Sequence, residues 1–117
     1  MGVSTRGVRK SEEVGMALMT GGEALAHSLV REGVELVFGL PGVQVMDAID
    51  ALHGLADIRL VTVRNEQAAT YMAFGYARTT GKIAAALVVP GPGALNAASG
   101  LLTAYSVSTP VLLISGQ

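Results

Sequence analysis

Residues 58–93, IRLVTVRNEQAATYMAFGYARTTGKIAAALVVPGPG, contain the pattern that decides the fold. The apolar run at 58–63 predicts a buried strand, and the alanine-rich segment 65–80 predicts a helix. A second apolar run at 83–89 predicts another strand, and the alternating Pro and Gly residues at 90–93 are a turn signal. Because two strands joined through a helix run parallel in most proteins, this stretch predicts a right-handed strand–helix–strand unit.

The same alternation continues on both sides of this stretch. We predict further helices and strands in the order helix 20–33, strand 34–40, helix 43–52, helix 94–106 and strand 111–115. The first helix opens on Thr20 with Glu23 three residues later, which is the pattern of a capping box. Continuous apolar strands that alternate with helices predict an α/β fold, a doubly wound parallel sheet with helices on both faces.

The loops that follow the strands are the expected functional region, because ligands bind beyond the carboxyl ends of strands in such sheets. We expect three loops, 39–42, 64–66 and 90–93, to lie along one rim. The fourth strand reaches this rim at 116–117, where the chain stops. We therefore expect a piece of a longer protein, truncated after the fourth strand, with its folded unit at 19–117.

Charge and cysteine content exclude several function classes. Eight basic and nine acidic residues give a net charge of −1, which argues against nucleic acid or an acidic membrane as a partner. The absence of cysteine excludes disulfides and thiolate zinc sites. No apolar run approaches the roughly 18 residues that a membrane span needs. The polar segment 1–18 lacks the apolar core of a secretory signal, so we predict a flexible leader and a cytoplasmic protein.

The carboxyl group of Glu66 stands where a strand ends and a helix begins. One interpretation is structural, because an acid in the first helical turn complements the helix dipole, worth roughly 0.3 to 1 kcal/mol. The other is functional, because a carboxyl group held in a cleft can exchange or share a proton. Position alone favours the structural interpretation.

The glycine-punctuated loop at 91–93 opens a helix and offers backbone N–H groups to an anion. It does not match the dinucleotide fingerprint G-x-G-x-x-G, because Asn96 stands at the last glycine position. Two glycines that allow a tight turn and close packing explain the loop equally well.

The remaining polar candidates predict no metal site. His27 and His53 are expected at the surface, and Asp47 and Asp50 face away from the apolar stripe of their helix, towards solvent. Gly75 lies inside the third helix, where glycine costs about 1 kcal/mol against alanine, so we expect close helix packing there.

Four motifs together resemble the N-terminal, pyrimidine-binding domain of thiamine diphosphate-dependent enzymes of the acetolactate synthase and 2-oxo acid decarboxylase type. They are GVELVFGLPG (33–42), RNEQAATYMAFGYARTTGK (64–82), GPGALNAASGLLTAY (91–105) and TPVLLISGQ (109–117). Their order and spacing fit along residues 19–117.

The resemblance implies a catalytic role for Glu66. In the family, the matching Glu hydrogen-bonds the N1′ nitrogen of the aminopyrimidine ring and favours the imino tautomer of the 4′-amino group. That nitrogen removes the proton from the thiazolium C2 carbon, and the resulting ylid attacks the carbonyl carbon of a 2-oxo acid. The cofactor carries the hard chemistry, and the protein supplies a carboxyl group and the geometry.

The resemblance also implies binding positions around Glu66. The cofactor-binding positions are Pro41, Gly42, Gly91, Pro92, Gly93 and Asn96 together with Glu66, and the substrate-side positions are Val43 and Gln44. Val43 is apolar and lacks the acidic or hydroxyl group that some members use on substrate. Two departures blur the subfamily: Asn65 stands where acetolactate synthases often carry His, and Phe74 where Asp is common.

The family holds the cofactor's diphosphate and its Mg²⁺ on a separate domain with a Gly-Asp-Gly…Asn motif, which this chain lacks. The resemblance therefore implies half of a cofactor site, inactive alone, in a homo-oligomer, dimer or tetramer, that decarboxylates or ligates small 2-oxo acids. Two alternatives are a non-catalytic binding or regulatory module and an unrelated nucleotide-binding domain. The presence of Glu66 argues against the first, and the failed fingerprint against the second.

Overall fold

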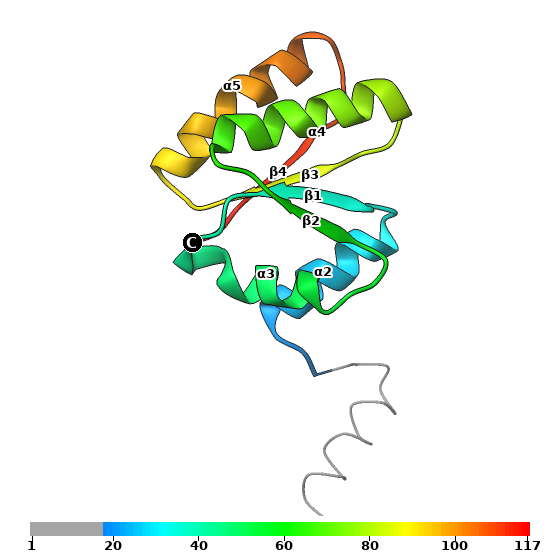
Figure 1. Ribbon diagram of the computed structural model, residues 1–117, viewed down its shortest axis with the longest axis vertical. Helices are drawn as coiled ribbons and strands as arrows, with labels where there is room; N and C mark the ends of the chain where they lie inside the picture. The colour runs from blue at the N-terminus through cyan, green and yellow to red at the C-terminus, as the bar shows by residue number, and fades with distance from the viewer. Residues whose placement is uncertain (1–17) are drawn as a thin grey trace, which may run out of the picture.

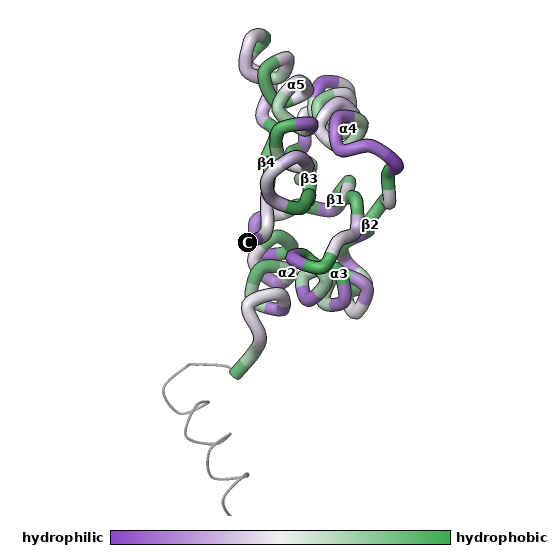
Figure 2. The backbone as a smooth tube through the Cα atoms, turned by 90° about the vertical axis from the view of Figure 1, so that its left-hand side faces the viewer, coloured by the Kyte–Doolittle hydropathy of each residue, from purple (hydrophilic) through white to green (hydrophobic). Residues whose placement is uncertain are grey.

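The computed structural model describes residues 18–117 and shows a sheet between two layers of helices (Figure 1). Four parallel strands lie in the order β2-β1-β3-β4; they are β1 (Leu36–Gly39), β2 (Arg59–Thr62), β3 (Ala85–Val88) and β4 (Leu112–Ser115). Helices α2 (Gly21–Arg31) and α3 (Met46–His53) cover one face, and α4 (Glu66–Thr80) and α5 (Pro92–Ser106) cover the other (Figures 1 and 2). The predicted doubly wound sheet is confirmed. The predicted leader lies outside the described residues apart from Leu18, which is exposed.

The capping box predicted at the start of α2 is present. Thr20 Oγ1 accepts a hydrogen bond from the Glu23 amide at 3.1 Å, and Glu23 Oε2 accepts one from the Thr20 amide at 2.8 Å, which completes the capping box of α2. Helix α4 ends at Gly81, whose φ of +73° is the left-handed conformation that glycine adopts at helix ends.

Two helix starts differ from the predictions. The segment after β1 opens with a 3₁₀ turn, η1 (Val43–Val45), before α3 begins at Met46. Helix α5 begins at Pro92 rather than at residue 94. Proline fits the first helical position because its missing N–H would have no partner there and its φ is already helical.

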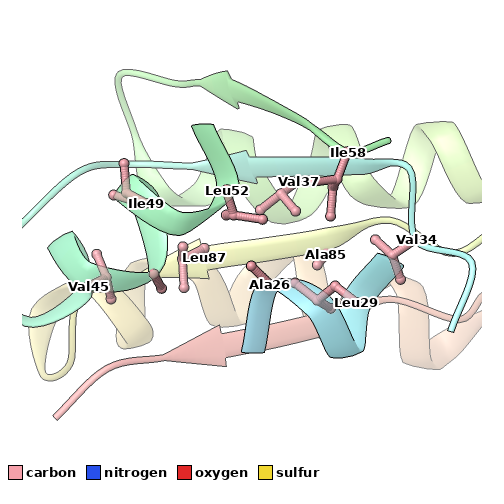
Figure 3. Packing of buried hydrophobic residues seen from close by; sticks show 11 residues of the cluster. Ala26, Leu29, Val34, Val37, Val45, Ile49, Leu52, Ile58, Ala85 and Leu87 are labelled. Carbon is pink, nitrogen blue, oxygen red and sulfur yellow. The ribbon is translucent and has the colours of Figure 1, made fainter. Parts of the chain in front are cut away.

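The core consists of two apolar clusters, one on each face of the sheet. Neighbouring residues of a strand point to opposite faces, so Val37 packs with α2 and α3 while Phe38 packs towards α4 and α5. In β3, Leu87 joins the first cluster and Val88 the second. Figure 3 shows Val37, Ala85 and Leu87 of the first cluster beside α2 and α3.

The expectation that the 58–63 run forms a buried strand is wrong for β2. This strand lies at an edge of the sheet, with Arg59 and Thr62 exposed and Leu60 and Val61 only half-buried. An apolar run predicts a strand but does not reveal how many neighbours flank it, and β2 has β1 on one side only.

The close helix contact is at Gly100, and the expectation that Gly75 provides it is wrong. A Cβ on Gly75 would meet no atom within 4 Å. A Cβ on Gly100 would overlap the hydroxyl of Thr70 in α4 and lie 2.8 Å from the Tyr71 amide nitrogen. The close approach of α4 and α5 therefore depends on the glycine of α5, Gly100, and not on the glycine of α4, Gly75.

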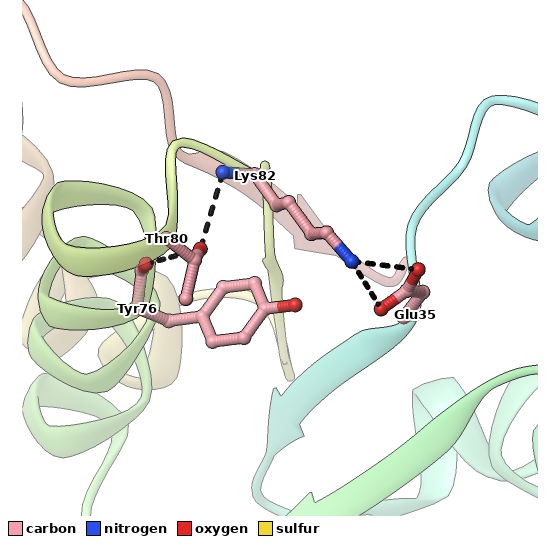
Figure 4. A network of polar contacts seen from close by, with 4 residues as sticks. All are labelled: Glu35, Tyr76, Thr80 and Lys82. Atoms are coloured by element: carbon pink, nitrogen blue, oxygen red, sulfur yellow. Dashed lines mark hydrogen bonds and ion pairs between the residues drawn. The ribbon is translucent and has the colours of Figure 1, made fainter.

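An exposed ion pair joins the end of α4 to the start of β1. Lys82 Nζ lies 3.0 Å from both carboxylate oxygens of Glu35, and the Thr80 hydroxyl accepts a hydrogen bond from the Lys82 amide at 3.1 Å (Figure 4). The hydrogen bond and negative charge of Glu35 raise the pKa of Lys82. Because both side chains are more than half exposed, solvent screens the pair, and we assign it little stability.

Candidate functional site

Three loops meet at the carboxyl end of the sheet. They follow β1, β2 and β3, and because all strands run parallel, the loops lie on one rim, as predicted (Figure 1). The end of β4 reaches the same rim. A Cβ on Gly116 would lie 2.5 Å from the carbonyl oxygen of Gln44, so the chain beyond β4 touches the loop that follows β1.

Glu66 is the first residue of α4 and is half-buried. The preceding Asn65 caps the helix, since its Oδ1 accepts a hydrogen bond from the Gln67 amide at 2.8 Å. With Asn65 serving the helix end, the Glu66 carboxyl group is not needed as the cap. It reaches across to α5 instead, where Asn96 Nδ2 donates a hydrogen bond to Glu66 Oε2 at 3.2 Å.

The second carboxyl oxygen, Glu66 Oε1, faces the first turn of α5. Within residues 18–117, no group donates a hydrogen bond to it. A Cβ on the buried Gly93 would lie 3.5 Å from this oxygen and 2.8 Å from Val89 Cγ2. Glycine at position 93 therefore fits closely against Val89 and places no side chain beside Oε1.

Val89 connects two of the loops and was not predicted as a site residue. A Cβ on Gly42 would overlap Val89 Cγ1, and a Cβ on Gly93 would crowd Val89 Cγ2. Both predicted glycines thus pack on the two methyl groups of one half-buried side chain. The only sequence signal for Val89 is its place between a buried strand and a Pro-Gly loop.

The loop before α5 depends on Gly91. This residue is the N-cap of α5 and has a φ of +69°, in the left-handed region that favours glycine. Gly91 and Pro92 are exposed on the rim, whereas Gly93 is buried.

The predicted substrate-side residues lie on the loop after β1. Pro41 and Gln44 are exposed, and Val43 is 86% exposed. The structure brings Gly42 together with Gly93, Glu66 and Asn96 through Val89, and it leaves the side chains of Pro41, Val43 and Gln44 directed at solvent.

The other polar candidates behave largely as predicted. His27, His53 and Asp50 are exposed. Asp47 is exposed too, but it is not merely solvated: its Oδ2 accepts a hydrogen bond from the Gly22 amide at 2.8 Å and so serves the N-terminus of α2. Within residues 18–117, no three His, Cys, Asp or Glu side chains form a group that could hold a metal ion, and no helix has the length and apolar character for a membrane span.

A comparison with protein families identifies the class. Residues 19–117 match the model described as "Thiamine pyrophosphate enzyme, N-terminal TPP binding domain". The match covers most of the chain, so the chain belongs to this family, and the family resemblance seen in its motifs is confirmed.

Individual relatives narrow the similarity to acetolactate synthase. The chain is 54% identical to the acetolactate synthase large subunit of Haemophilus influenzae over 102 residues, which are 87% of this chain and 18% of the relative. It is 49% identical to the acetolactate synthase isozyme 3 large subunit of Escherichia coli, with the same coverage. The large subunit from Lactococcus lactis is 40% identical over 98 residues. The chain thus spans about 18% of the length of the Haemophilus influenzae and Escherichia coli relatives.

Proposed function

We propose that this chain supplies the ring-activating half of a thiamine diphosphate site in an enzyme of the acetolactate synthase type. The observation that carries the proposal is the arrangement of Glu66. One of its carboxyl oxygens accepts a hydrogen bond from Asn96, and the other, beside a glycine at the rim of the sheet, has no donor among residues 18–117. Family membership supports thiamine diphosphate as the ligand for that rim.

The residues present fit the aminopyrimidine end of the cofactor. A ring nitrogen needs one protein group that can share a proton with it, and Glu66 Oε1 is such a group. A flat ring also needs a surface without protruding side chains, which Gly42 and Gly93 provide, and an apolar wall, which Val89 provides. When bound, thiamine diphosphate supplies the carbon nucleophile and the electron sink for reactions of 2-oxo acids.

In this proposal, Glu66 holds a proton between Oε1 and the ring nitrogen. The Asn96 amide stabilises negative charge on Oε2 whenever that proton moves to the ring, because a hydrogen bond to a charged acceptor is stronger than one to a neutral acceptor. Asn96 therefore acts on Glu66, while Gly91 and Pro92 hold the start of α5 in place. Pro41, Val43 and Gln44 would face the substrate from the loop after β1.

The wider assembly belongs to the same proposal. A separate diphosphate-binding domain, from the same chain or a partner, would hold Mg²⁺ and complete the site. We propose a homo-oligomer in the cytoplasm, a dimer or tetramer, whose substrates are small 2-oxo acids for decarboxylation or carboligation. These 117 residues alone would be inactive.

A non-catalytic binding or regulatory module with the same fold is the second candidate. Such a module has no requirement for the carboxyl group of Glu66 or for the unblocked oxygen beside Gly93. Both features are present, and they favour the enzyme.

Turnover of Glu66→Gln in the full-length protein tests the proposal. Glutamine keeps the size and the Asn96 contact geometry but cannot share a proton, so we expect kcat to fall by about 10²- to 10⁴-fold. Glu35→Gln is the matched control, because Glu35 is an exposed carboxylate in a surface ion pair. Turnover by Glu66→Gln close to that of the control would contradict the proposal.

A further inference from the structure

The contact between α4 and α5 is built around a buried hydroxyl group. Thr70 is 0% exposed, and its Oγ1 donates to the carbonyl oxygen of Ala97 in α5 at 2.7 Å. The same hydroxyl lies 3.2 Å from the Gln67 carbonyl of its own helix, a longer contact. Gly100 lies directly against it, because a Cβ there would be 2.7 Å from Thr70 Cβ.

The contact of Thr70 with Gly100 lies about one helical turn beyond Glu66 in α4 and beyond Asn96 in α5. Thr70 follows Glu66 by four residues, and Gly100 follows Asn96 by four residues. Four residues of helix advance about 6 Å, so the distance between the helices at this contact also affects the distance one turn earlier, between Glu66 and Asn96. Ala97, which accepts the Thr70 hydrogen bond, is the neighbour of Asn96 in the chain.

The Glu66–Asn96 hydrogen bond is sensitive to that spacing. Its length of 3.2 Å is at the long end of the range for N–H···O bonds, about 2.7 to 3.2 Å. A separation of the helices by a few tenths of an ångström would therefore lose it.

We infer that Thr70 is a positioning residue of the cofactor site: its hydroxyl holds α5 at the distance where Asn96 orients the Glu66 carboxyl group. The inference rests on the proposed function of Glu66. This positioning role needs both the hydroxyl group of Thr70 and the volume of its side chain. Valine has the same shape without the donor, and serine has the donor without the methyl group, so the two substitutions separate hydrogen bonding from packing.

The test measures thiamine diphosphate binding to the full-length protein by calorimetry with Mg²⁺ present. We expect Thr70→Val to raise the cofactor Kd about tenfold, the effect of losing one well-formed hydrogen bond. Thr70→Ser should stay within about twofold of the parent. The matched control is Thr79→Val, which makes the same change in the same helix at an exposed hydroxyl bonded within α4, to the Gly75 carbonyl at 2.9 Å.

A double-mutant cycle that combines Thr70→Val with Asn96→Ala checks whether Thr70 affects cofactor binding through Asn96. If Thr70 acts through Asn96, the two substitutions together raise the Kd little more than Asn96→Ala alone. A crystal structure of the unloaded Thr70→Val protein should show Asn96 Nδ2 more than 3.5 Å from Glu66 Oε2. A purely structural Thr70 would lower the melting temperature and leave the Kd unchanged. An unchanged Kd, or additive effects in the cycle, would overturn the inference.

Two further variants allow for a Thr70→Val protein that does not fold, and separate failure of the positioning role from failure of the proposed function. If Thr70→Val does not fold, Thr70→Ala removes the same hydroxyl without adding an atom near Gly100, and the same criteria apply. Glu66→Gln is assayed in parallel. Wild-type turnover in Glu66→Gln rejects the proposed function, whereas impaired turnover in Glu66→Gln with wild-type cofactor binding in Thr70→Val rejects only the positioning role.

Discussion

The contacts of the Glu66 side chain bear on whether it only complements the helix dipole or has a functional role. An acid that only complements a helix dipole needs no partner outside its own first turn. Here Asn65 already satisfies the Gln67 amide, and the Glu66 carboxyl group crosses to Asn96 on another helix. The side chain is thus held by tertiary contacts at the rim, which supports a role in binding or proton transfer.

The capping role of Asn65 gives a prediction at the same scale. Asn65→Ala removes the acceptor for the Gln67 amide and should lower the stability of the chain by about 1 kcal/mol. Asn65→Asp keeps an oxygen in the same place and serves as the control. Denaturant midpoints measure both variants, and equal midpoints for Asn65→Ala and the parent would contradict the assignment of the cap.

Single residues also mark how far the sequence could predict the site. Motif matches identified Glu66, Gly93 and Asn96, and the structure brings these three together. Val89 and Thr70 were missed. Each lies in an apolar or small-residue segment where its type indicates only packing, and its importance comes from partners distant in the chain.

At the scale of elements, the order of the α-helices and strands in residues 18–117 was predictable from apolar periodicity and caps, apart from the short 3₁₀ turn η1. Strand ends were not. The run at 83–89 forms a strand only at Ala85–Val88, and the adjacent Ala84 is equally buried, so an apolar run does not mark where a strand ends. The edge position of β2 also depends on strand order, which local sequence does not encode.

The packing of α4 against α5 predicts opposite changes in stability when alanine replaces Gly75 and when it replaces Gly100. Gly75→Ala should stabilise the chain by about 0.5 to 1 kcal/mol, because alanine favours the helix and its Cβ meets no atom within 4 Å. Gly100→Ala should destabilise it by about 1 to 3 kcal/mol, because the new Cβ would overlap Thr70. Urea midpoints measure both, and a stabilising Gly100→Ala would show that the two helices are not in close contact.

At the scale of the whole molecule, α5 presents an uncharged apolar surface. Its sequence contains no Asp, Glu, Lys or Arg, and Leu95, Leu102 and Tyr105 are 76%, 67% and 83% exposed. These three residues are spaced to lie on one side of the helix. A helix side of this kind is normally covered, and a two-fold copy can cover it without like-charge repulsion.

We therefore predict that the chain self-associates through α5. Sedimentation should show a dimer for the parent and a shift towards monomer for Leu102→Glu, which places a charge in the apolar surface. His53→Glu, at an exposed position on α3, is the control and should sediment as the parent does. A monomeric parent at high concentration would contradict this prediction.

The most direct test of the central claim, that Glu66 activates the cofactor ring, is the rate of C2 proton exchange on thiamine diphosphate bound to the full-length protein. Exchange into deuterium oxide, followed by NMR after acid quenching, reports proton removal without substrate or product release. The claim predicts exchange at least about 10²-fold slower in Glu66→Gln than in the parent, with Glu35→Gln unchanged. Exchange in Glu66→Gln within a few-fold of the parent rate, with cofactor bound, would contradict it.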